Sequence, residues 1–221
     1  MSAVKLLIAA ESNSGKTTLT KSLENALVVS YDGKKFPFRV PHVNVESFDT
    51  VEDLINLIGE KVEAYNEKFG HYPSTIVFDS VSKIFDTVMD NCNTKYKGFQ
   101  IYTELNKEVH ALTDYIQNVL IASDINVILI SHAIYDPETS RYNLIGKGDF
   151  QKRGGFVAET DEAIFIEVKN NKRIVHFRST KFPARTLQED LPDSIAVEEF
   201  NLGQHIALLE GNQQDADEFA L

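Results

Sequence analysis

The chain has 221 residues, with 22 Lys or Arg against 33 Asp or Glu, so its formal net charge is −11. Hydrophobic residues make up 43% and charged residues 25%, which suffices for a folded core and excludes disordered and fibrous proteins. The single cysteine, Cys92, cannot form an internal disulfide, and the early apolar run from Leu6 to Ala10 is too short for a signal peptide or a membrane span. We therefore predict one cytoplasmic domain.

Charged residues are unevenly distributed along the chain. Residues 141–185 hold 10 basic and 5 acidic side chains, whereas residues 186–221 hold 9 acidic and no basic ones. A local basic segment can contact phosphates within a Debye length of about 8–10 Å, although surplus lysines on a solvated loop would give the same composition. We expect a folded core over residues 1–209 and a disordered acidic tail over 210–221, which could cover the basic segment, dock a partner or only solvate the chain.

The first elements read as strand, loop and helix. The apolar run at residues 4–10 is followed by "ESNSGKTTLTKSLENAL", in which Leu19, Leu23 and Leu27 recur at helical spacing. A second buried strand is predicted over residues 27–32. The next segment, residues 48–70, places Val51 and Leu54 on one helical face, has Asp49 or Thr50 as its cap, and stops at Gly70.

The centre of the chain alternates strands and helices. "STIVFDS" (74–80) and "INVILISH" (125–132) are β-branched apolar runs, and two helices are expected between them, the second over residues 102–122. Such alternation predicts parallel strands, with ligands at their carboxyl ends. Residues 162–168 and 173–179 then read as two strands joined by a tight turn at Asn170 and Asn171. The predicted fold is α/β, with a mostly parallel central sheet flanked by helices and an antiparallel hairpin near the C-terminus.

The most specific motif is "AESNSGKTT", residues 10–18, between the first strand and helix. A phosphate loop needs a turn whose N–H groups converge on phosphate oxygens, a Lys for the β- and γ-phosphates, and a Ser or Thr for Mg²⁺. Gly15, Lys16 and Thr17 fill the last three positions, while Ala10 replaces the first glycine, for which we expect slight strain. The predicted ATP-binding residues are Ser12, Asn13, Ser14, Gly15, Lys16, Thr17 and Thr18.

A carboxylate at the end of a later strand is independent evidence for a nucleotide site. Asp79 ends the strand "TIVF", where nucleotide hydrolases hold the Mg²⁺ shell, so Thr17 and Asp79 are the predicted metal ligands. Ser80 follows where some of these enzymes place a glutamate, so the group that orients the attacking water must come from elsewhere.

These pieces resemble a family. "ESNSGKTTL", "IVFDS" and "VILISH" are similar to the phosphate loop, the acidic strand and the nucleotide-sensing strand of RecA-type recombinases. The short chain looks most like the RecA-core ATPases of phage recombination modules, the Sak-type single-strand annealing group, over roughly residues 4–186. The resemblance implies a RecA-like P-loop fold and a DNA-stimulated ATPase that uses ATP and Mg²⁺. It also implies single-stranded DNA and further copies of the chain as partners, a single-strand DNA-binding protein as a candidate partner, and the host cytoplasm as location.

The same resemblance implies catalytic roles. Asp32 matches a carboxylate that orients water, but it is shorter than the usual Glu, and it could be only a turn residue before Gly33. Glu11, inside the loop, is the competing candidate. His132 would sense the γ-phosphate, although a structural histidine is an equal alternative.

Two cations beyond the hairpin, Lys181 and Arg185 in "STKFPAR", resemble residues that reach a neighbouring subunit's nucleotide. An inserted cation stabilises the charge of phosphoryl transfer and contributes about 10³–10⁵ in rate. A pair of surface cations beside a Pro turn is the alternative.

Residues 133–156 form a long connection that mixes glycines, cations and aromatic residues. Cations neutralise phosphates while aromatic faces stack bases, so we expect a single-stranded DNA site here. Its predicted residues are Arg141, Lys147, Phe150, Lys152 and Arg153. The alternative is a lid over a small substrate, which would make the protein a nucleotide or small-metabolite kinase, and a third class is an interaction protein with an inactive phosphate loop.

Overall fold

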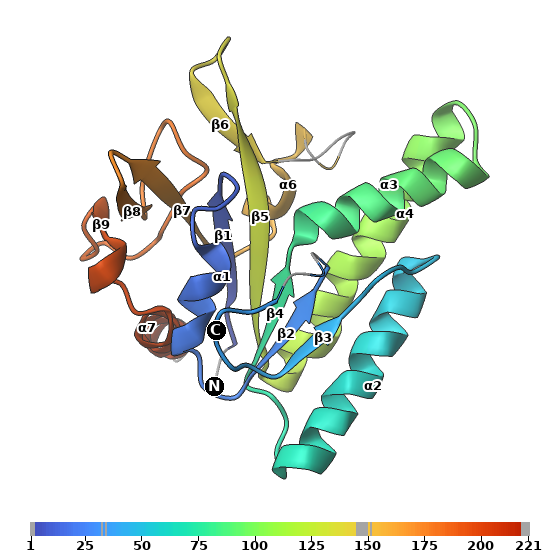
Figure 1. Cartoon of the computed structure of the whole chain (residues 1–221), viewed down its shortest axis with the longest axis horizontal. Coiled ribbons are helices and arrows are strands. Elements are labelled where there is room, and N and C mark those ends of the chain that lie inside the picture. The colour runs from blue at the N-terminus through green and yellow to red at the C-terminus, as the bar shows by residue number, and fades with distance from the viewer. Residues whose placement is uncertain (1–2, 32, 34, 145–149, 151, 218–221) are drawn as a thin grey trace.

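The computed structural model describes every residue except 1–2, 32, 34, 145–149, 151 and 218–221. A nine-stranded sheet runs through the centre of the described chain (Figure 1). Its strands are β1 (Lys5–Ala10), β2 (Ala26–Ser30), β3 (His42–Asn44), β4 (Thr75–Asp79), β5 (Asn126–Asp136), β6 (Arg141–Leu144), β7 (Glu162–Lys169), β8 (Lys172–His176) and β9 (Ser194–Ala196).

The strand order is β3-β2-β4-β5-β1-β7-β8-β9, with β6 paired to β5. Strands β3 to β7 along this path are parallel, whereas β8 and β9 pair antiparallel. Asn170 and Asn171 both have positive φ, 50° and 60°, as a two-residue hairpin turn requires. The predicted α/β class, parallel centre and late antiparallel hairpin are confirmed.

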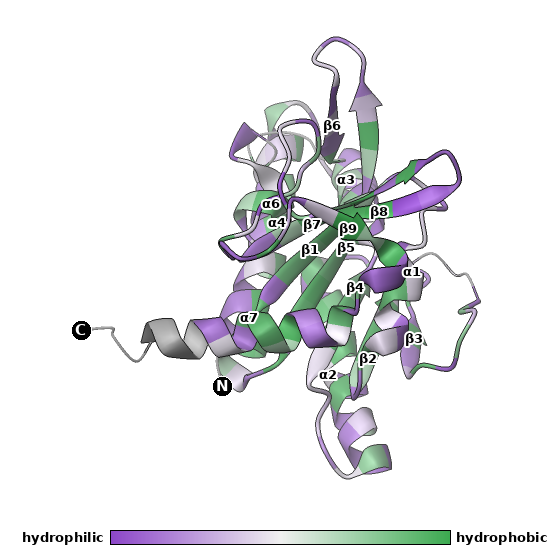
Figure 2. Cartoon of the chain, turned by 90° about the vertical axis from the view of Figure 1, so that its left-hand side faces the viewer, coloured by the Kyte–Doolittle hydropathy of each residue, from purple (hydrophilic) through white to green (hydrophobic). Residues whose placement is uncertain are grey.

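Helices cover both faces of this sheet (Figures 1 and 2). One face carries α2 (Val51–Phe69), α3 (Val81–Lys95) and α4 (Phe99–Tyr115), which continues through a π-helical turn (Ile116–Leu120) and a 3₁₀ turn (Ile121–Ser123). The other face carries α1 (Lys16–Leu19) with its 3₁₀ turn (Thr20–Ser22), a 3₁₀ turn at Val197–Glu199, and α7 (Leu202–Asp217). Because the central strands are covered on both sides, they are continuous apolar runs: Leu6 and Leu7 are fully buried in opposite core layers.

Local signals explain the bounds of α2. Thr50 is its cap: the Asp53 N–H donates to Thr50 Oγ1 at 3.2 Å, and the Thr50 N–H donates to Asp53 Oδ2 at 3.0 Å. Gly70 ends the helix in the left-handed conformation, with φ of 79°. Both ends therefore agree with the prediction.

Two helix predictions are corrected. The helix after the phosphate loop is one turn, α1, followed by the 3₁₀ turn, so the apolar spacing up to Leu27 overstated its length. At the other end, α7 passes residue 210 and continues to Asp217. Leu202, Ile206 and Leu209 bury its first turns against the sheet, and their helical spacing was the signal for this helix.

The long connection at residues 133–156 is partly regular. β5 continues to Asp136 and pairs antiparallel with β6, so a hairpin projects beyond the sheet (Figure 1). A short helix, α6 (Gly155–Ala158), follows. Among the described helices, none has the length and apolar character needed to cross a membrane.

Candidate nucleotide-binding site

The loop between β1 and α1 has the backbone of an anion-binding turn. Asn13 and Gly15 adopt left-handed φ values of 62° and 92°, and such alternation turns successive N–H groups toward one centre. Ala10, which replaces the expected first glycine, lies inside β1, paired with His132 and Ile166. The predicted strain at Ala10 is therefore wrong, because an extended strand residue accepts a methyl side chain.

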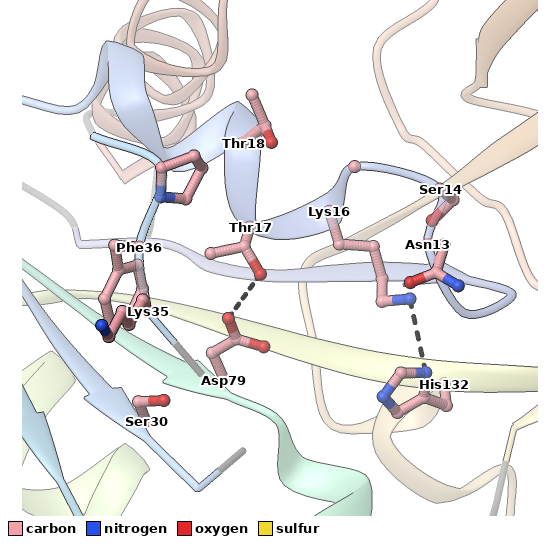
Figure 3. Close-up of a pocket in the computed structure, with 12 residues that line it drawn as sticks. Asn13, Ser14, Lys16, Thr17, Thr18, Ser30, Lys35, Phe36, Asp79 and His132 are labelled. Atoms are coloured by element: carbon pink, nitrogen blue, oxygen red, sulfur yellow. Dashed lines mark hydrogen bonds between the residues drawn. The ribbon is translucent and has the colours of Figure 1, made fainter. Parts of the chain in front are cut away.

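Lys16 lies at the centre of the site, with only 6% of its surface exposed. Its Nζ donates to the carbonyl oxygens of Glu11 at 2.7 Å and Ala10 at 3.2 Å, and lies 3.4 Å from His132 Nδ1 (Figure 3). This proximity arises because β5 pairs directly with β1, which sets His132 beside Ala10. The predicted γ-phosphate sensor and the phosphate-loop lysine are thus neighbours.

Thr17 and Asp79 form the predicted metal pair. Thr17 Oγ1 donates to Asp79 Oδ2 at 2.6 Å, and Asp79 is 6% exposed at the end of β4 (Figure 3). A hydroxyl and a carboxylate are the hard oxygen ligands that Mg²⁺ takes beside substrate phosphates. The pair therefore fits the role that the sequence predicted.

A serine on α3 holds His132 in place, and the sequence analysis did not identify it. The His132 N–H donates to Ser82 Oγ at 2.8 Å, and Ser82 Oγ lies 3.0 Å from Ser131 Oγ. Ser82 is 1% exposed. Its polar side chain on a buried helix face next to Asp79 was the available signal.

A cavity of about 290 Å³ opens in front of this loop. It is lined by Asn13, Ser14, Gly15, Lys16, Thr17, Thr18, Ser30, Lys35, Phe36, Pro37, Asp79 and His132. Ser12 is exposed on the loop and does not line it. The segment Lys35–Pro37 was not predicted; Figure 3 shows Phe36 on the side of Thr17 and Thr18.

The cavity fits a polyphosphate with Mg²⁺. Ser14 Oγ is buried there and finds no hydrogen-bond partner among the described residues. An orphaned hydroxyl beside Lys16 and converging N–H groups is satisfied when a phosphate oxygen accepts from it. Ser14 and Lys16 would then hold the phosphates, and Thr17 and Asp79 the cation, which when bound offsets charge on the β- and γ-oxygens.

Of the two candidate carboxylates, the structure describes Glu11. Asp32 lies outside the described residues. Glu11 is exposed, and its carboxylate lies close enough to the Tyr142 hydroxyl on β6 to act on its pKa. Burial, and then the negative charge and hydrogen bond of Glu11, raise the pKa of Tyr142 above its ordinary value. Glu11 therefore joins the phosphate loop to the β5–β6 hairpin.

The two cations after the hairpin lie at opposite ends of β7: Lys181 is beside Glu167 near its carboxyl end, whereas Arg185 pairs with Ala163 near its amino end. Lys181 is exposed; its Nζ is 3.9 Å from Glu167 Oε1 and 5.7 Å from the Tyr142 ring centroid. The guanidinium of Arg185 donates to the backbone carbonyls of Val157 and Thr160 of its own chain. Both cations therefore have internal partners: Arg185 donates to two backbone carbonyls, whereas Lys181 has a longer ion pair and contacts with aromatic rings.

The predicted DNA residues separate into two groups. Arg141, Lys152 and Arg153 are exposed, and Lys147 lies outside the described residues. Phe150 is a correction: it is 8% exposed and its ring packs edge-on against Phe156 at 4.9 Å, so no base can stack on it. Its hydrophobic side chain is part of the core. The charged residues around it in the sequence had suggested a surface position.

Fold and site together define an α/β P-loop nucleotide-binding protein, with phosphate loop, acidic strand end and sensing strand at one edge of the sheet. A family model described as an AAA domain matches residues 2–186, and the chain belongs to this family. It is thus a P-loop ATPase domain of AAA type, as the predicted ATPase core implied. No curated protein matches the sequence.

Proposed function

We propose that this protein hydrolyses ATP and binds single-stranded DNA in recombination or annealing of the phage type, as the resemblance to Sak-type ATPases implies. One observation carries the proposal: β5 bears His132 at the nucleotide cavity and, three residues later, Tyr135 in the projecting hairpin. His132 and Tyr135 lie on the same strand, β5, and a strand is stiff along its length. A movement of His132 at the nucleotide cavity would therefore move the hairpin as well.

The hairpin has the side chains that a single strand of DNA needs. Tyr135 is 43% exposed, and its ring lies 5.2 Å from that of Tyr142. Arg141 is exposed on β6, and Lys181 is attached to the hairpin because the Tyr142 N–H donates to its carbonyl at 2.9 Å. An exposed ring for stacking and cations for phosphates together favour binding without sequence preference.

The electrostatic effect of Glu11 on the Tyr142 hydroxyl supports coupling of the two sites. Glu11 also supplies a carbonyl to Lys16, so a phosphate that draws the Lys16 ammonium away loosens the same loop segment. DNA on the hairpin and nucleotide on the loop would therefore change each other's affinity, as linkage requires.

Assembly is part of the proposal. Lys181 is the better candidate for a neighbour's nucleotide, because it is exposed and its ion pair with Glu167 is long, at 3.9 Å. Arg185 would first have to leave the carbonyls of Val157 and Thr160. Further copies of the chain, a single-strand DNA-binding protein as an additional partner, and action in the host cytoplasm complete the proposed function.

The test is ATP turnover measured over a range of protein concentrations under three conditions: without DNA, with single-stranded DNA and with duplex DNA. Stimulation by single-stranded DNA that rises with protein concentration supports the proposal. Turnover that is indifferent to DNA contradicts it, and phosphate transfer to a nucleoside monophosphate would instead identify a kinase.

A further inference from the structure

The β7–β8 hairpin reaches past the point where the phosphate loop begins. β1 ends at Ala10, which pairs with Ile166, whereas β7 continues to Lys169. Arg173 pairs with Val168 in this extension. The hairpin thus carries an arginine to the level of the loop from the side of the sheet opposite β5.

Arg173 lies on the same face of β8 as the phosphate loop. Residues two apart on a strand share a face, and Val175 is buried in the core layer that contains Leu19 of α1. The contact itself is at Gly15: a Cβ built on Gly15 would lie 2.8 Å from Arg173 Nη1 and 3.9 Å from Arg173 Cζ. The guanidinium therefore occupies the space that a side chain at position 15 would take.

This guanidinium has no counter-charge among the residues that the structure describes. Arg173 is half-buried, and no described residue accepts a hydrogen bond from it or forms an ion pair with it. An arginine is always charged and carries five N–H donors, so a partly exposed one without an acceptor among the described residues has donors to offer an anion.

We propose that Arg173 is an additional ligand of the nucleotide's phosphates, supplied by the same chain that supplies the loop. Arg173 does not line the cavity in its present rotamer, so its flexible side chain turns inward over Gly15 when a polyphosphate binds. It differs from Lys181 and Arg185, which are proposed to act on a neighbour. The inference rests on nucleotide binding at this loop, but not on DNA binding.

The experiment is equilibrium binding of fluorescent ATP and ADP analogues with Mg²⁺ to wild type, Arg173→Met and Arg173→Lys. Methionine keeps the aliphatic length without the charge, and lysine keeps the charge. The matched control is Lys172→Met, an exposed cation one residue away on the same strand. We expect Arg173→Met to raise the Kd about tenfold or more, as loss of a charge-assisted hydrogen bond does, Arg173→Lys to recover part of that loss, and Lys172→Met to match wild type.

Protein concentration separates the same-chain role from a role across subunits. The Arg173→Met defect should be the same at dilute and high protein concentration. Affinity of Arg173→Met within twofold of wild type overturns the proposal, and equal losses in Arg173→Met and Arg173→Lys assign Arg173 to loop packing instead. Nucleotide binding by wild type without any response to DNA would defeat only the proposed function, whereas no nucleotide binding by wild type would defeat both.

Discussion

Thr17 and Asp79 are 62 residues apart in sequence, yet Thr17 Oγ1 donates a 2.6 Å hydrogen bond to Asp79 Oδ2. The bond joins the start of α1 to the end of β4, across the end of β5. Both oxygens are ones that a divalent cation takes as ligands, so the hydrogen bond holds the ligand pair together in advance. Pre-positioning of this kind lowers the entropic cost of binding the cation.

Replacing Asp79 by Asn tests this pair. Asparagine keeps the shape and an oxygen acceptor for Thr17 but removes the negative charge. We expect the Mg²⁺ concentration needed for tight ATP binding to rise about 10–100-fold, the range for disrupted metal sites. A Mg²⁺ titration of ATP binding measures this. Asp86→Asn, an exposed carboxylate on α3, is the control, and coincident titrations for Asp79→Asn and wild type would contradict the assignment.

His132→Gln separates sensing from binding. His132 contacts Lys16 and lines the cavity, and as the predicted sensor of the γ-phosphate it should act on the chemical step. We expect turnover to fall about 100-fold, the effect of removing one preorganised donor, with ATP affinity little changed. Single-turnover hydrolysis beside equilibrium binding checks both quantities. His110→Gln, exposed on α4, is the matched variant; a purely structural His132 would show lost stability with normal turnover in the folded fraction.

Phe36→Ala tests the unpredicted wall of the cavity. Phe36 lines the cavity on the side of Thr17 and Thr18, away from Lys16 and His132 (Figure 3), so we expect the base of a nucleotide to lie against it. Loss of a stacking ring should weaken ATP binding about tenfold, from roughly 1–3 kcal/mol per stacked base. Competition by inorganic tripolyphosphate, which has no base, should be unchanged. Equal weakening of tripolyphosphate would show that Phe36 acts on the loop rather than on the base.

Arg141→Ala and Lys181→Ala probe the proposed DNA surface. Each should weaken single-stranded DNA binding regardless of sequence and reduce the salt slope by about 1, because each removes one phosphate contact. Fluorescence anisotropy at several salt concentrations gives both values. Lys107→Ala, on α4 and paired with Glu104, serves as control. Unchanged slopes in both variants would exclude this hairpin as the binding surface.

Phe150→Ala should act on stability and not on DNA. Because Phe150 is buried against Phe156, truncation should cost about 3–5 kcal/mol of unfolding free energy. Urea denaturation measures the loss, and Phe99→Ala, at a side chain 92% exposed, should change it by less than about 0.5 kcal/mol. If the folded Phe150→Ala protein lost DNA affinity at full stability, the stacking role would be restored.

The amino-acid sequence by itself determined the features that depend on neighbouring residues. The phosphate loop at Ser12–Thr17 follows from a glycine and small polar residues between an apolar strand and a helix. The Asn170–Asn171 turn and the Thr50 cap are likewise short-range, because their hydrogen bonds and φ values involve residues at most a few positions apart.

Tertiary structure decided everything that depends on which distant segments pack together. Phe150, predicted to lie on the surface, is buried in the core. β5 between β1 and β4 brings His132 to Lys16, and the length of β7 carries Arg173 to Gly15. Neither contact has a local signature, because the order and register of strands follow from burial of the whole sheet between two layers of helices.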